Sequence, residues 1–346
     1  MRIVFFGTPA FAVPSLEALI GSAHDVIGVI SQPDRPKGRG QQVQSTPTKQ
    51  VAQAHAIPVI QPVKIKEDAF LQAIRDLQPD LGVVVAFGRI LPDALLAIPR
   101  LGMINVHGSI LPRYRGAAPI QRAVLAGDTE TGVTIMRVAT ALDAGPTFSA
   151  GTVPIPPDAT SGDVEATLAR LGAQLLLPVV DDLAAGRAVE TPQDDARATH
   201  AAKITKAEGT LDWNEPAAVV HNKVRGLQPW PLASTHLAGE RLVLRRTWPL
   251  GHPGDPGVRS PFGHADGVRS PIRQSEVTGS PEGRNGDLTP GTPGTVVRAD
   301  GDELIVACGG GTALRVLEIQ PEGRRTMTAR EFLAGRGAAE GARFEP

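Results

Sequence analysis

The fold is decided by residues 102–109, which have the sequence GMINVHGS. A short apolar run leads to Asn105 and His107, which are separated by Val106 and followed directly by Gly108. Because side chains two residues apart in an extended strand point to the same face, Asn105 and His107 share one face and Val106 packs on the other. Open α/β sheets place their ligands at the carboxyl ends of their strands. We therefore expect Asn105 and His107 to lie at the ligand-binding edge of such a sheet.

A third polar residue follows a second predicted strand, residues 132–138. An asparagine amide donates hydrogen bonds to an oxyanion, and a histidine relays protons near neutral pH when a carboxylate orients its ring. Asp143 is the candidate for that carboxylate, since it follows the strand and precedes Gly145. The alternative is that His107 is an ordinary core histidine and that Asp143 only forms a turn. The meeting of three polar groups at the ends of two strands favours a catalytic site.

The rest of the first half alternates apolar strand patterns with helical ones. Continuous apolar runs are typical of buried parallel strands, and an amphipathic stripe indicates a helix between them. The predicted strands are 2–6, 26–30, 81–87 and 132–138, and the predicted helices are 48–56, 67–77, 120–126 and 161–184. This rhythm predicts an α/β domain with an open, mostly parallel, Rossmann-like sheet. The first turn lacks a Gly-x-Gly-x-x-Gly pattern, so a dinucleotide site is not favoured.

The second half has a different pattern. Residues 189–206 are polar and without periodicity, and we expect them to link a catalytic domain at 1–188 to a second domain at 207–346. Alternating and apolar runs with glycine turns in the second domain predict a small antiparallel, OB-like β-barrel. Residues 251–290 are rich in Gly, Pro and Ser, and we expect a flexible insertion there.

Composition limits the class of protein. A chain of 346 residues is long enough for two domains, and a net charge of −1 gives no general attraction to nucleic acid, so RNA contacts would depend on local patches. The single cysteine, Cys308, follows an apolar run, and we expect it to be buried and without a catalytic role. There is no spanning-length apolar run and no signal-peptide pattern at the start, so we expect a soluble, cytoplasmic protein. The spacing of His, Cys and carboxylates predicts no metal site.

Five separate motifs occur in the order known from one enzyme family. They are FGTPAF at 6–11, QPDRP at 32–36, NVHGSILP at 105–112, TGVTIM at 131–136 and RGLQPWP at 225–231. The chain resembles the folate-dependent formyltransferases, and among them the methionyl-tRNA formyltransferase family. The resemblance covers nearly the whole chain outside residues 251–290.

The resemblance implies a reaction and a partner. A formyl group would pass from 10-formyltetrahydrofolate to the α-amino group of methionine on initiator methionyl-tRNA, by direct attack of the amine. Asn105 and His107 would stabilise the oxyanion, and Asp143 would orient His107. We expect a monomer that binds folate as co-substrate, without a metal.

The resemblance also implies contact residues. Folate contacts are expected from Arg89, Ile90 and Leu91 and from Ser109, Ile110, Leu111 and Pro112, although ordinary core packing is the alternative for Ile90 and Leu91. Contacts to tRNA are expected from Arg39, Arg35 and Lys37 in a long polar loop, and from Lys203 and Lys206. For these basic residues, a plain solvated surface is the alternative.

Two other functions fit parts of the sequence. A formyltransferase acting on a small amine, such as an amino sugar or a purine precursor, would need the same three polar residues. The polar loop and the second domain argue against it. An RNA-binding module on an inactive α/β scaffold would not need Asn105, His107 and Asp143.

Overall fold

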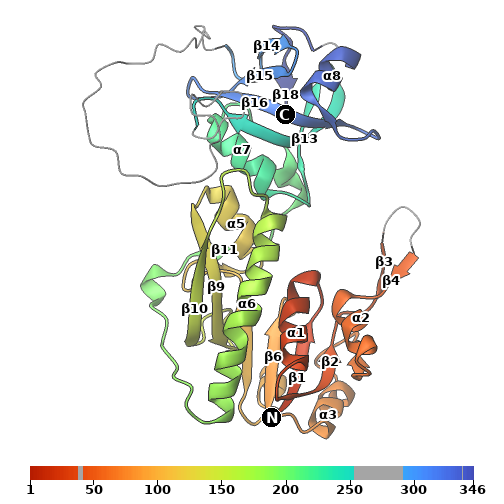
Figure 1. Ribbon diagram of the computed structural model, residues 1–346, viewed down its shortest axis with the longest axis vertical. Coiled ribbons are helices and arrows are strands. Elements are labelled where there is room, and N and C mark those ends of the chain that lie inside the picture. The colour runs from red at the N-terminus through yellow and green to blue at the C-terminus, as the bar shows by residue number, and fades with distance from the viewer. Residues whose placement is uncertain (38–41, 253–290, 337) are drawn as a thin grey trace, which may run out of the picture. The chain divides into compact units, whose positions relative to one another are not determined.

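The computed structural model describes residues 1–37, 42–252, 291–336 and 338–346 (Figure 1). These residues form two compact units, Met1–Thr205 and Lys206–Pro346. Arg39 and most of the predicted insertion lie outside the described residues. Within the described ranges, the helices are all too short or too polar to cross a membrane.

The first unit contains a seven-stranded sheet with the order β10-β9-β7-β6-β1-β2-β5. Neighbouring strands from β7 to β5 in this order run parallel. Strand β9 pairs antiparallel with β7, and β10 pairs antiparallel with β9. The strands are β1 (Arg2–Gly7), β2 (Asp25–Ile30), β5 (Val59–Ile60), β6 (Leu81–Val85), β7 (Met103–His107), β9 (Glu130–Arg137) and β10 (Thr147–Pro154). The predicted mostly parallel, Rossmann-like sheet is confirmed.

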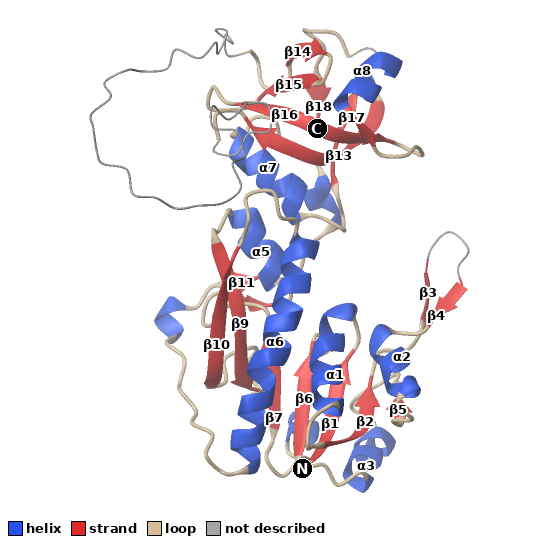
Figure 2. Cartoon of the chain, in the orientation of Figure 1, coloured by secondary structure: helices blue, strands red, loops and turns tan. Residues whose placement is uncertain are grey.

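Helices cover both faces of this sheet. Figure 2 shows α1 and α6 along one face, and α3 packs on the other. The helical segments are η1 (Ala10–Ala12), α1 (Val13–Ile20), α2 (Pro47–Ala54), α3 (Asp68–Asp76), α4 (Asp93–Leu96), α5 (Pro119–Ala126) and α6 (Ser161–Ala184). Helix α6 has the bounds that the sequence predicts.

Neighbouring residues of one strand belong to different hydrophobic clusters. Ile3 and Phe5 of β1 pack with α1 and α6, whereas Val4 and Phe6 pack with α3 on the opposite face. Strand β7 follows the same two-residue period, since Val106 belongs to the cluster on the α6 side. Because of this alternation, the polar residues of β7, Asn105 and His107, point away from α6.

Helix α6 approaches β7 closely at a glycine. A Cβ added to Gly172 would lie 2.7 Å from the Val106 side chain, which is closer than carbon atoms pack. The helix is capped by Thr160, whose hydroxyl accepts from the Asp163 amide while the Asp163 carboxylate accepts from the Thr160 amide. Ser161 is the first helical residue, directly after this reciprocal pair begins at Thr160.

The second unit is an antiparallel sheet with the path β14-β15-β16-β13-β12-β18. An isolated antiparallel bridge joins Thr295 to Arg343, the residues that precede β14 and β18, so the two ends of the curled sheet approach each other. The strands are β12 (Ala233–Leu237), β13 (Glu240–Pro249), β14 (Val296–Asp300), β15 (Glu303–Ala307), β16 (Ala313–Pro321), β17 (Met327–Thr328) and β18 (Phe344–Glu345), and the helices are α7 (Ala217–Gly226) and α8 (Ala329–Arg336). The predicted antiparallel barrel is confirmed. Cys308 is 2% exposed, and burial raises the pKa of its thiol to about 12.

Candidate active site

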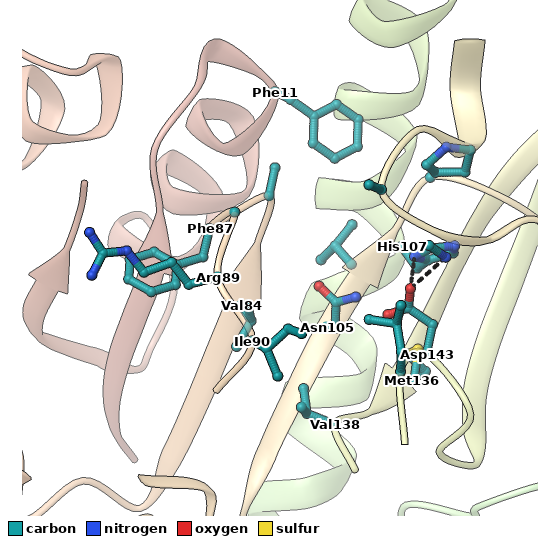
Figure 3. A pocket seen from close by; sticks show the side chains of 18 of the residues that line it. Phe11, Val84, Phe87, Arg89, Ile90, Asn105, His107, Met136, Val138 and Asp143 are labelled. Carbon is teal, nitrogen blue, oxygen red and sulfur yellow. Dashed lines mark hydrogen bonds and ion pairs between the residues drawn. The ribbon is translucent and has the colours of Figure 1, made fainter. Parts of the chain in front are cut away.

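A cleft of about 550 Å³ opens at the carboxyl ends of β6 and β7 (Figure 3). It is lined by Asn105 and His107 from β7, by Asp143 from the loop after β9, and by the loop after β6. The structure therefore brings the three predicted catalytic residues together in one cavity of the first unit. The cavity lies at the edge of the sheet that the sequence pattern indicates.

Asn105 presents an unused amide to this cleft. Figure 3 shows its side chain extending from β7 into the cavity. The residue is half-buried, and among the described residues its side chain makes no hydrogen bond. A ligand oxygen can therefore accept from the Asn105 amide without displacing an internal partner.

His107 is held in one orientation by a backbone carbonyl. Its ring is 5% exposed, and Nε2 lies 2.9 Å from the carbonyl oxygen of Tyr114. Because a carbonyl only accepts, Nε2 carries a hydrogen and Nδ1 is the nitrogen that faces Asp143. The distance from Nδ1 to Asp143 Oδ2 is 3.7 Å, which suits an ion pair but is too long for a hydrogen bond.

Asp143 adopts a left-handed backbone conformation. Its φ is 49°, which costs an ordinary residue of order 1–3 kcal/mol and persists only where the surroundings hold it. The carboxylate is 15% exposed, and its Oδ2 accepts a 2.9 Å hydrogen bond from the Gly116 amide. The side chain is thereby directed toward His107 and the cleft.

Sequence reasoning missed Gln193, which lies in the predicted linker. Its side-chain amide donates to the carbonyl oxygens of Asp143 and Gly145, at 2.9 and 2.7 Å. These contacts join positions about fifty residues apart, so no local pattern could have indicated them.

Sequence reasoning also missed Glu165, a residue of α6 that lines the cleft. Its carboxylate has neither a hydrogen bond nor an ion pair within the described part of the chain, and burial raises its pKa above the usual value. The only signal in the sequence is an acid beside Val164 at the edge of an apolar stripe, which is common on amphipathic helices.

The predicted folate residues fall into two groups. Arg89, Ile90 and Leu91 line the cleft, and Ile90 is 75% exposed. The Arg89 guanidinium is positioned by the Gln32 side chain at 3.0 Å and by the Val63 carbonyl at 2.8 Å. This loop offers an exposed apolar wall beside a fixed cation.

The second group forms the turn after β7 and does not line the cleft; it comprises Ser109, Ile110, Leu111 and Pro112. The Ser109 hydroxyl donates to the Arg113 carbonyl at 2.6 Å, and its carbonyl accepts from Thr134 at 2.7 Å. These bonds shape the turn. Folate contact by this group stays a prediction.

The predicted tRNA residues within the described ranges lie outside the cleft lining. Arg35 and Lys37 are on β3 (Arg35–Lys37), which pairs with β4 (Gln42–Gln44), while Lys203 and Lys206 are exposed. Neighbouring Lys49 is paired with Asp34 at 2.5 Å, and this bond holds the pKa of the Asp34 carboxyl below its usual value. The base of the β3–β4 ribbon is thus fixed by internal bonds.

Comparison with known protein families gives the class of protein. The family described as "Formyl transferase" matches residues 1–180, and "Formyl transferase, C-terminal domain" matches residues 203–337.

Two curated proteins named methionyl-tRNA formyltransferase align over nearly their full length. The protein of Trichlorobacter lovleyi is 42% identical over 345 residues, 100% of this chain and 97% of that protein. The protein of Methylococcus capsulatus is 43% identical over 333 residues, 96% of each. The chain belongs to the methionyl-tRNA formyltransferase family.

A solved structure supports the fold. WlaRD, a sugar 3N-formyl transferase crystallised in the presence of dTDP and 5-N-formyl-THF, superposes with a TM-score of 0.61 at 15% identity. The match covers 94% of this chain and 99% of that chain. At this level of identity the likeness concerns the fold.

Proposed function

We propose that this enzyme transfers the formyl group of 10-formyltetrahydrofolate to the α-amino group of methionine on initiator methionyl-tRNA. Family membership supports formyl transfer as the reaction class. The observation that carries the mechanism is the meeting of three groups in one cleft: the unused Asn105 amide, Nδ1 of His107 and the Asp143 carboxylate.

Attack of the neutral amine on the formyl carbon forms the new C–N bond and a tetrahedral oxyanion. Asn105 donates to this oxyanion from its amide, which has no competing internal partner. His107 donates from Nδ1 when that nitrogen is protonated, because Nε2 is already committed to the Tyr114 carbonyl. Asp143, 3.7 Å from Nδ1, balances the charge of the imidazolium.

Collapse of the intermediate breaks the bond between the formyl carbon and the folate nitrogen. The proton lost by the attacking amine goes to that leaving nitrogen, carried by Asp143 through solvent. No acyl-enzyme forms, which agrees with the internal hydrogen bond that occupies the Ser109 hydroxyl. The chain therefore supplies orientation, charge stabilisation and proton movement.

The folate ring would lie against Arg89, Ile90 and Leu91. Ile90 exposes most of its side chain on the wall of a cleft, and covering it with a flat ring would remove apolar surface from water. The Arg89 guanidinium would face polar atoms of the donor.

The acceptor tRNA would meet the basic residues Arg35, Lys37, Arg39, Lys203 and Lys206 and the second unit. Phosphate contacts of this kind are independent of base sequence and weaken as salt rises. The KM for tRNA would therefore increase with salt, while the KM for the folate donor would change little.

A formylation assay tests the proposal. The enzyme is incubated with 10-formyltetrahydrofolate and, in parallel, with charged initiator methionyl-tRNA, an amino-sugar nucleotide and a purine-precursor amine. We expect formyl-methionyl-tRNA as the product. Faster turnover of either small amine would assign the enzyme to that acceptor class instead, and absence of turnover with every acceptor would refute the enzymatic proposal.

A further inference from the structure

We propose that Gln193 is a positioning residue of the active site, whose side-chain amide holds the Asp143 loop in the conformation that directs the Asp143 carboxylate at His107. The importance of that geometry for turnover rests on the proposed function. The holding contact itself is independent of it.

All the hydrogen-bonding capacity of the Gln193 side chain is used on two loops of the site. Nε2 donates to the carbonyls of Asp143 and Gly145, at 2.9 and 2.7 Å. Oε1 accepts from Nε and Nη2 of Arg115, at 3.1 and 2.8 Å. One amide thus ties the loop after β9 to the residue that precedes Gly116.

Gly116 completes the connection, because its amide is the donor to Asp143 Oδ2 at 2.9 Å. Gln193 holds the backbone of Asp143 on one side, and Gly116 holds its carboxylate on the other. Asp143 needs this support since its φ of 49° is strained for a residue with a side chain. Without Gln193, the carbonyls of Asp143 and Gly145 would each lose this partner, and the loop could relax.

Arg115 fixes the glutamine in turn. Its guanidinium is 14% exposed and also pairs with Asp195 Oδ1 at 2.6 Å. A charged donor on Oε1 polarises the amide and strengthens the bonds that Nε2 makes. The Arg115–Gln193 pair therefore holds the Asp143 loop in place.

The same stretch of chain also holds the other partner of His107. Thr199 accepts from the Tyr114 amide through Oγ1 at 2.8 Å, and its carbonyl accepts from the Arg115 amide at 2.9 Å. Strand β11 (His200–Ala201) then pairs with β8 (Arg115–Gly116). Residues 193–201 therefore support both the Asp143 loop and the Tyr114 carbonyl that orients His107.

The test compares Gln193→Ala and Gln193→Glu with Glu190→Gln. Glu190 belongs to the same stretch and accepts from the Arg137 side chain at Nε at 3.0 Å, so its variant weakens a contact of the stretch that does not involve Asp143 or Gly116. Gln193→Glu keeps an oxygen for Arg115 but removes the donors to the two carbonyls. Circular dichroism and thermal melting verify that each full-length variant is folded.

The first readout is independent of activity. The Gly116 amide donates to Asp143 Oδ2, so its hydrogen exchange, followed by NMR on glycine-labelled protein, reports whether the carboxylate is in place. We expect exchange at Gly116 to accelerate about tenfold or more in both Gln193 variants, and to be unchanged in Glu190→Gln. Unchanged protection of Gly116 in folded Gln193→Ala would overturn the inference.

The second readout is whether each variant changes kcat, KM or both. In both Gln193 variants we expect the Asp143 carboxylate to be misplaced by a fraction of an ångström to about 1 Å. The value of kcat should then fall by up to about 100-fold, with KM for donor and acceptor nearly unchanged. If Gly116 exchange accelerates while kcat is unaffected, Gln193 still positions Asp143, but the catalytic role proposed for Asp143 is refuted. If kcat falls with Gly116 still protected, the positioning role is refuted and the proposed reaction stands.

Discussion

His107 donates a 2.9 Å hydrogen bond from Nε2 to the carbonyl oxygen of Tyr114. The tyrosine is itself anchored, since its hydroxyl donates to Asp128 Oδ2 at 2.8 Å and its amide donates to Thr199. Because Nε2 is occupied by this bond, Nδ1 is the ring nitrogen that faces Asp143. An orientation that a main-chain carbonyl maintains does not depend on a ligand being bound.

The Asn105 amide gives the most direct test of oxyanion stabilisation. Asn105→Ala should lower kcat by about 10²–10³, the usual cost of one oxyanion donor, with KM for both substrates changed little. Asn105→Asp, which keeps the shape and removes the donor, should lose a similar amount. Thermal melting should be nearly unaffected, since the amide has no partner within the described residues. Wild-type turnover by either variant would contradict the role.

Gly145 tests the placement of the Asp143 loop without touching a catalytic side chain. An added Cβ would clash with the carbonyl oxygen of Arg137, so Gly145→Ala must displace the loop. We expect kcat to fall by about 100-fold, as a 1 Å misplacement of a catalytic group does, and the melting temperature to fall as well. Gly21→Ala is the matched control.

At Gly21 the added Cβ would lie 3.5 Å from the nearest carbonyl oxygen, an ordinary contact. That change should leave turnover intact and stabilise by about 0.4–1 kcal/mol through the unfolded chain. Full activity in Gly145→Ala, measured in the same formylation assay, would show that the loop tolerates displacement.

Glu165 predicts a pH-dependent stability. Burial raises the pKa of its carboxyl in the folded state, so folding is unaffected by this group at pH values below the unfolded pKa, where both states are protonated. Stability is lost as the pH rises through the raised pKa, because the folded protein must then hold a desolvated charge. Glu165→Gln should therefore melt higher than the wild type at about pH 7.5 and equally at about pH 4.

The control for this experiment is Glu17→Gln on α1, since Glu17 is exposed. Its variant should shift the melting temperature little at either pH, because a single exposed surface charge contributes little to stability. A lower melting temperature for Glu165→Gln at neutral pH would mean that the carboxylate has a stabilising partner.

Cys308 should be inert in the folded protein. Burial raises the pKa of its thiol to about 12 and leaves the residue 2% exposed, so the reactive thiolate is both scarce and covered. A thiol reagent at about pH 8 should label the protein only after denaturant is added. Rapid labelling of the native protein would contradict the buried position.

Local patterns were sufficient to predict the sheet and the edge where the site lies. The alternation around Val106 needs only the two-residue period of a strand, and α6 needs only a helical stripe, because burial of one face determines each pattern. Asn105 and His107 could be located for the same reason.

Gln193 could not be found in this way. Its partners are Asp143, Gly145 and Arg115, and its role exists only once distant segments are folded together. The direction of a side chain was equally hidden: Ser109 lies within the most informative motif, yet its hydroxyl bonds to Arg113 and is turned from the cleft. Sequence patterns report burial and period, whereas hydrogen bonds between loops depend on the final geometry.

The unpaired amide of Asn105 has a consequence for inhibitor chemistry. Most polar groups in a folded protein must release one partner before they accept another, and that exchange consumes much of what a new contact contributes. Here a compound that carries an oxygen acceptor opposite Asn105 would have to displace only solvent. Tetrahedral mimics of the formyl carbon, such as hydrated aldehydes joined to a folate ring, are thus a rational starting scaffold.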